Sequence, residues 1–129
     1  MTTISACKAN LTKALTALES VKGKVPASFL GPVHPQQSGG DLDAIQATIQ
    51  NHVMQISVAF RTVKGGRQAF LNFLKTSENQ EADSHAYVAY MKEARVDDIM
   101  ASTEGILKIL HSRLSEIDAR VEVNRLTVQ

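Results

Sequence analysis

The sequence predicts an all-α protein, an elongated bundle of three long helices and one short helix with coiled-coil character in the last helix. Apolar residues recur at alternating steps of three and four along most of the 129 residues. Helix-favouring residues such as Ala, Leu, Lys and Gln are common, whereas aromatic residues make up only 5% of the chain. All the prolines lie in one stretch, residues 24–40, which separates the first two helical patterns.

The composition is that of one domain of no extreme charge. A hydrophobic content of 43% is enough for a core, and the net charge of +1 gives no argument for a nucleic-acid or membrane partner. The charge is unevenly distributed, with four Lys and one Glu in residues 1–25 and six acids against two bases in residues 77–100. We expect these segments to form complementary faces of one fold or assembly.

The lone cysteine and the absence of long apolar runs bear on the cellular compartment. Cys7 cannot form a disulfide within the chain, and Lys8 and Lys13 fall where a signal peptide would need an apolar run. No stretch is apolar enough to cross a bilayer. We expect a soluble, intracellular protein, cytoplasmic or nuclear, without a membrane partner.

A first helix is predicted from about residue 3 to residue 22. Thr2 or Thr3 would cap its start, and Gly23 would end it before Pro26. One apolar stripe runs along it, with Cys7 as a small core residue. The stripe consists of Ile4, Cys7, Leu11, Ala14, Leu18 and Val21.

Residues 24–40 are predicted to be a connecting loop, because their prolines and glycines exclude regular structure. Phe29, Leu30 and Val33 are expected to pack this loop against the bundle. The sequence Pro-Val-His-Pro at residues 32–35 has the form of a proline-rich ligand, but four residues are too few to specify one.

A second helix is predicted over residues 41–63, with Asp41 as its N-cap. Val53 and Phe60 widen its apolar stripe beyond that of a two-stranded coil, which indicates a multi-helix bundle. His52 falls in this stripe, where a core or interface histidine is favoured over a metal ligand because no partner has ligand spacing. The heptad positions are Leu42, Ile45, Ile49, His52, Ile56, Ala59 and Val63.

Lys64-Gly65-Gly66-Arg67 is expected to interrupt the helical pattern with a kink or turn. It lacks the length and the following Lys-Ser or Lys-Thr of a phosphate-binding loop. A short helix is predicted over residues 67–76, with Phe70, Phe73 and Leu74 on one apolar face. Phe70 and Phe73 are expected to form the aromatic core of the bundle.

A long helix is predicted over residues 78–125, opened by a capping box of Ser77 and Gln80. Gly105 is expected to mark a local bend or a close helix contact. The last third of the chain carries the most regular heptads, typical of a helix pressed along another helix. The heptad residues are Leu107, Leu110, Leu114, Ile117, Val121, Asn124 and Val128.

These last heptads are the predicted self-association interface. At about 1.5 Å per residue the long helix would span roughly 70 Å, which its partners within one chain barely cover. A second copy, or another helical protein, is expected to cover the remainder. Asn124 would then fix the register of the pairing.

No motif predicts an enzyme, a cofactor or a metal site, and the carboxylates cluster on one helix instead of flanking a cleft. The leading interpretation is therefore a helical self-association or scaffold module. The alternative is a helical adaptor or a weak nucleic-acid-binding module, which a salt titration of RNA binding would distinguish. Its basic patch would consist of Lys8, Lys13, Lys22, Lys24, Lys64 and Arg67.

Four segments resemble the N-terminal helical region of gag-type polyproteins from BEL/Pao retrotransposons. They are ISACKANLTKAL from Ile4, FLNFL from Phe70 ahead of an acidic linker, YVAYMKEA from Tyr87 and ILHSRLSEI from Ile109. The resemblance covers most of the chain and implies a structural, self-assembling protein without catalytic residues. The zinc knuckles and protease of such polyproteins are absent from this sequence, so it would correspond to an N-terminal piece or a domesticated relative.

Overall fold

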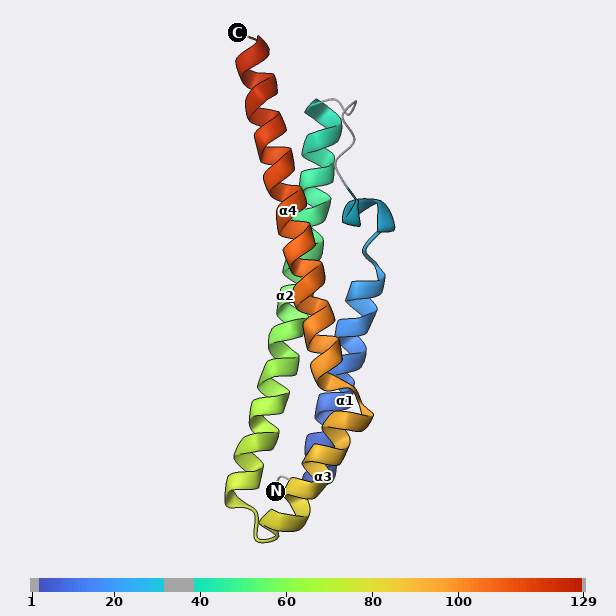
Figure 1. The fold of residues 1–129 in the computed structure, drawn as a ribbon, viewed down its shortest axis with the longest axis vertical. Helices are drawn as coiled ribbons and strands as arrows, with labels where there is room; N and C mark the ends of the chain where they lie inside the picture. The colour runs from blue at the N-terminus through green and yellow to red at the C-terminus, as the bar shows by residue number, and fades with distance from the viewer. Residues whose placement is uncertain (1–2, 32–38, 129) are drawn as a thin grey trace.

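The computed structural model describes residues 3–31 and 39–128, of which residues 39–41, 127 and 128 are described by their backbone alone. The regular structure in this part of the chain is all helical (Figure 1). The all-α prediction is confirmed. The described helices are α1 (Ile4–Gly23), the short 3₁₀ helix η1 (Ala27–Leu30), α2 (Gly39–Thr76), α3 (Gln80–Glu93) and α4 (Val96–Val128).

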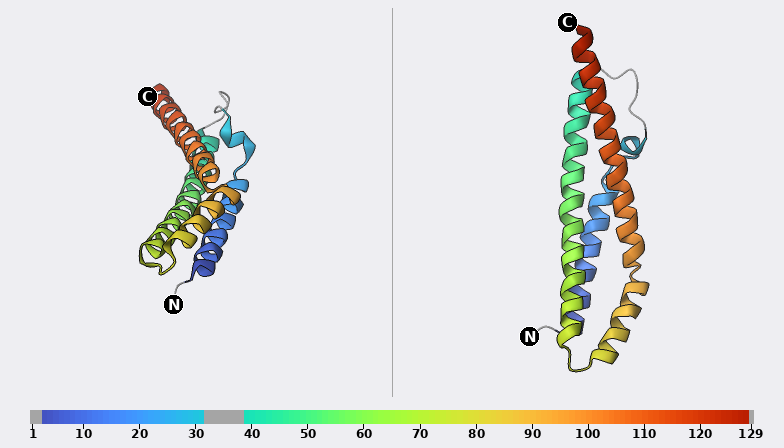
Figure 2. Two further views of the ribbon diagram at one scale, coloured as in Figure 1. Left: turned by 60° about the horizontal axis from the view of Figure 1, so that its bottom comes forward. Right: turned by 60° about the vertical axis from the view of Figure 1, so that its left-hand side comes forward.

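The bundle is elongated around two long antiparallel helices, α2 and α4 (Figures 1 and 2). α1 packs along the second half of α2, where Gly66 lies beside Leu11. After the turn at the end of α2, α3 returns beside α1. η1 contacts α4. The C-terminal end of α4 therefore lies at the opposite end of the bundle from the start of α1.

α1 begins and packs as its sequence predicts. The Oγ1 of Thr3 accepts a hydrogen bond of 3.1 Å from the amide of Ala6, which caps the helix. The predicted stripe is the buried face, with Ile4 and Val21 at its ends only half-buried. Cys7, Leu11, Ala14 and Leu18 of this stripe are buried, and Leu15, which the stripe did not include, is buried as well.

α2 is one uninterrupted helix, so the predicted break at residues 64–67 and the separate short helix at 67–76 are wrong. A glycine in a helix costs only about 1 kcal/mol, and packing on both sides of the pair outweighs this. Gly66 also lets α1 come close, because a Cβ there would lie 3.3 Å from Cδ1 of Leu11. Phe70 lies fully buried in the core, as predicted, while Phe73 and Leu74 are half-buried.

The predicted long helix over residues 78–125 is broken into α3 and α4 at Ala94 and Arg95. Arg95 has a φ of 55°, a left-handed conformation that costs a residue with a side chain roughly 1–2 kcal/mol. Neither glycine nor proline marks this break in the sequence. Burial of Val96, which is fully inaccessible to solvent, and the packing of α3 against α2 favour the broken form.

The start of α3 differs from the predicted capping box. Asn79 is the N-cap, and its side chain makes no capping hydrogen bond. Ser77 instead accepts a hydrogen bond from the amide of Asn79 and donates one to Asp83. Gln80 donates from its side chain to the carbonyl of Lys75, so it binds back to α2 instead of closing a box.

The segment predicted as a loop at residues 24–40 contains η1, and α2 already begins at Gly39. Phe29 packs against the core as expected, whereas Leu30 is exposed. Val33, the Pro-Val-His-Pro sequence at 32–35 and the side chain of Asp41 lie outside the described part of the structure.

Candidate functional site

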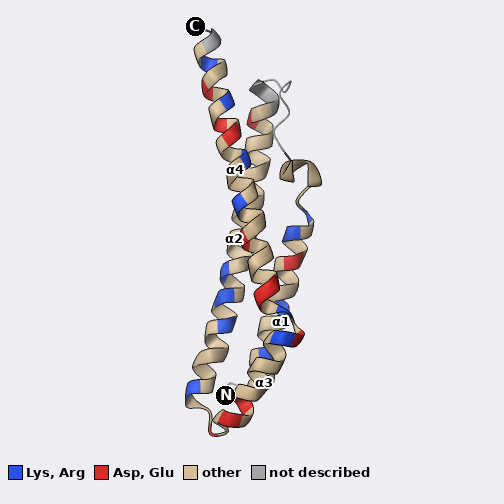
Figure 3. Ribbon diagram, in the orientation of Figure 1, with Lys and Arg blue, Asp and Glu red and all other residues tan. Residues whose placement is uncertain are grey.

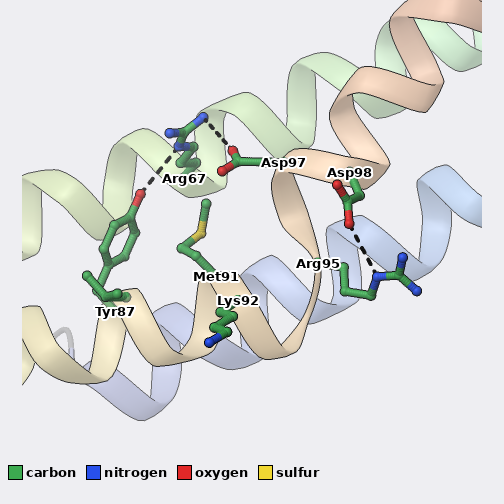
Figure 4. A pocket seen from close by; sticks show the side chains of 8 residues that line it. Arg67, Tyr87, Met91, Lys92, Arg95, Asp97 and Asp98 are labelled. Atoms are coloured by element: carbon green, nitrogen blue, oxygen red, sulfur yellow. Dashed lines mark hydrogen bonds and ion pairs between the residues drawn. The ribbon is translucent and has the colours of Figure 1, made fainter.

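A hollow in the bundle lies beside the break between α3 and α4, with a volume of about 440 Å³ (Figure 4). Arg67 of α2 reaches across it between two partners. Its Nε donates to the hydroxyl of Tyr87 at 3.3 Å, and its Nη1 lies 3.8 Å from a carboxylate oxygen of Asp97. Met91, Lys92, Arg95 and Asp98 complete most of the lining.

The charges in this hollow are largely matched within it. The hydrogen bond with Tyr87 is the main reason that the pKa of Arg67 is raised above its usual value. Arg95 pairs with Asp98 at 3.3 Å. In the described part of the chain, no three His, Cys, Asp or Glu residues are placed to hold a metal ion. We interpret this hollow as a structural joint that connects α2 with the α3–α4 turn.

The predicted self-association seam on α4 mostly faces the core of the same chain. Leu110 and Ile117 are fully buried, and Leu107, Leu114 and Val121 are half-buried against the core. Asn124 is exposed, and the side chain of Val128 lies outside the described part. The chain itself covers most of this seam, because the first half of α2 lies antiparallel beside it. Leu42, Ile49 and Ile56 of α2 are buried there, and Gln46 donates a hydrogen bond to Asp118 of α4.

The six predicted basic residues differ in how far they are engaged within the chain. Lys22 is bound to Glu19 at 2.8 Å and to Ser102 at 3.3 Å, and Arg67 is held in the hollow described above. Lys64 lies over the ring of Phe60, 4.3 Å from its centroid. Lys13 and Lys24 are exposed on α1 and at its end, and Lys8 is half-buried. The expected charge pairing between residues 1–25 and residues 77–100 is not seen for Lys22, whose acidic partner is Glu19. A base from α2, Arg67, pairs with Asp97 of the acidic segment.

A surface that the heptad analysis missed runs along the solvent side of α2. We call the residues Ala47, Gln50, Asn51, Met54 and Val58 the α2 outer face; all are exposed and lie within one third of the helix circumference. Met54 is 60% and Val58 56% exposed. No Asp, Glu, Lys or Arg occurs from residue 44 to residue 60. That run of 17 residues without a charged side chain was visible in the sequence.

His52 and Cys7 occupy the interior side of the bundle without forming a site. His52 is half-buried and meets Phe29 edge to face at 6.0 Å, and its buried Nδ1 has no hydrogen-bond partner among the described residues. Cys7 is buried, and burial raises the pKa of its thiol. A neutral, buried thiol is a packing group and a poor nucleophile.

No described helix is both long and apolar enough to span a bilayer. Comparison of the chain with protein-family models, with curated proteins and with solved structures gives no match.

Proposed function

We propose that the chain is a non-enzymatic helical module that associates with copies of itself, as part of an assembly or scaffold. The observation that carries this proposal is the α2 outer face. Exposed helix surfaces are normally rich in charge, whereas the centres of protein interfaces are depleted of Lys, Glu and Asp and enriched in Met. A helix face that lies in a 17-residue run without charge and exposes Met54 and Val58 has the composition of an interface.

A second copy is the simplest partner for this face. An uncharged surface meets its own copy without like-charge repulsion, and homo-oligomers with a two-fold axis are the commonest assemblies. The same role is the one that the resemblance to gag-type polyproteins implies. The proposed interface lies on α2 and not on α4, because the heptads of α4 are largely occupied within the chain.

The test is the mass in solution of the wild type and of Met54→Lys combined with Val58→Lys. We expect the wild type to exceed the monomer mass at tens to hundreds of micromolar, and the double variant to remain monomeric. Val88→Lys is the control for a lysine added at an exposed apolar position, because Val88 is 65% exposed on α3 and away from the α2 outer face. A wild type that stays monomeric at several hundred micromolar would refute the proposal.

Nucleic-acid binding remains the alternative, and one observation favours it. The second half of α2 carries bases only, since Arg61, Lys64, Arg67 and Lys75 have no acid between them (Figure 3). If this surface binds RNA, affinity should fall steeply with salt because phosphate contacts release counterions. Binding that is absent at 50 mM salt would remove this alternative.

A further inference from the structure

The α2 outer face has one charge at each end, and the two are opposite. Asp43 precedes it and Arg61 follows it, and both are exposed. Arg61 follows Asp43 by 18 residues, which is about five helical turns, so both lie on the same side of α2 as Met54 and Val58. The face is therefore acidic at one end, neutral over roughly 27 Å and basic at the other end.

We propose that two copies pack through the α2 outer face with their α2 helices antiparallel, around a two-fold axis level with residue 52. This inference rests on the proposed self-association and adds its orientation and register. In that arrangement Asp43 lies opposite the partner's Arg61, and Arg61 lies opposite the partner's Asp43. A two-fold contact repeats each pair, so two copies that each carry one acid and one base form two ion pairs.

The end charges select this orientation over a parallel one. In a parallel pair in register, Asp43 would face the partner's Asp43 and Arg61 would face the partner's Arg61, which places like charges at both ends. Charges at the rim of an interface contribute mainly to orientation and partner choice. The neutral centre fits either orientation, so the choice depends on the two end residues.

The centre of the face is also self-complementary in the antiparallel register. Met54 lies opposite the partner's Gln50, and its unbranched side chain adapts to the spaces beside an amide side chain. Val58 lies close to the level of the partner's Ala47, whose single methyl group leaves room for a branched side chain. Gln50 and Asn51 each carry donors and an acceptor, so amides from the two copies can pair with one another.

The test is a charge-reversal cycle measured by sedimentation velocity between about 5 and 500 µM. Arg61→Asp alone and Asp43→Arg alone each turn both ion pairs into like-charge pairs, and each should weaken dimerisation at least about tenfold at 50 mM salt. Arg61→Asp combined with Asp43→Arg restores two opposite pairs and should return the dimerisation constant to within about threefold of the wild type. The difference should shrink at 1 M salt, where exposed charges are screened.

Lys13→Asp is the control, because it makes the same change in net charge as Arg61→Asp at an exposed position on α1. Circular dichroism and the melting temperature verify folding. If Arg61→Asp fails to fold, Arg61→Gln replaces it, and dimerisation should weaken by about threefold to tenfold. In a parallel pair each residue faces its own copy, so a single reversal leaves like charges facing at both ends and the interaction there remains repulsive. A wild-type dimer whose single variants associate as tightly as the wild type therefore overturns the antiparallel register and leaves self-association standing. A monomeric wild type overturns both.

Discussion

Alanine substitutions at the two adjacent glycines of α2 should have different effects on stability. A Cβ at Gly65 would meet no atom within 4 Å, whereas a Cβ at Gly66 would lie 3.3 Å from Cδ1 and 3.8 Å from Cα of Leu11. Replacing a helical glycine by alanine gains about 1 kcal/mol where there is room. Gly65→Ala should therefore raise the free energy of unfolding by about 1 kcal/mol and the melting temperature by roughly 3–5 °C.

Gly66→Ala should not show this gain. Leu11 is fully buried, so its side chain has little freedom to withdraw, and overpacking a tight core costs about 1–3 kcal/mol. The cost offsets the helix propensity, and the variant should be less stable than Gly65→Ala by at least about 1 kcal/mol. Urea unfolding followed by circular dichroism measures the difference. Gly105→Ala, whose Cβ also meets nothing within 4 Å, is the control and should resemble Gly65→Ala. Equal gains at Gly65 and Gly66 would refute the close approach of α1 to α2.

Three further substitutions test separate features of the bundle. Arg95→Gly should stabilise the chain by about 1 kcal/mol in urea unfolding, because glycine removes the left-handed penalty, whereas Arg95→Ala retains the penalty and should not. His52→Leu should leave the melting temperature unchanged or raised, because it removes a buried nitrogen without a hydrogen-bond partner among the described residues; a fall of several degrees would reveal a missed polar contact. Because burial raises the pKa of Cys7 in the folded state, unfolding is favoured as the pH rises above the unfolded thiol's value of about 8.5. Stability should therefore decline from about pH 8 to about pH 10 more in the wild type than in Cys7→Ala, and equal declines would contradict a buried thiol.

The helices and most core positions were predictable from periodicity, because burial of an apolar stripe dominates helix packing. Leu11, Ile49, Ile56 and Ile117 all lie in the core at the heptad positions assigned to them. The two errors in helix boundaries came from local rules that tertiary packing overrode. α2 continues through Gly65 and Gly66 although glycine disfavours a helix. The break between α3 and α4 falls at Arg95, although arginine favours a helix.

The candidate interface was harder to predict, because heptads report burial without saying which chain supplies the cover. Leu110 and Ile117 form a regular seam whether α2 of the same chain or a second copy lies against them. Only the length and position of α2 decide between these cases. The uncharged run in α2 can be found in the sequence, but it indicates an interface only once Met54 and Val58 are known to be exposed to solvent.

The way α3 is attached has a consequence for hydrogen exchange. None of its 14 residues is fully buried, and its contacts with the rest of the bundle include the hydrogen bond between the hydroxyls of Tyr90 and Thr12 at 2.6 Å and the packing of Tyr87 on Phe70 at 4.9 Å between ring centroids. Segments with few buried apolar contacts open at a lower free energy than the core. The amides of α3 should therefore exchange together and earlier than those in the middle of α2 and α4, and each opening should briefly expose Phe70 while the two long helices remain paired.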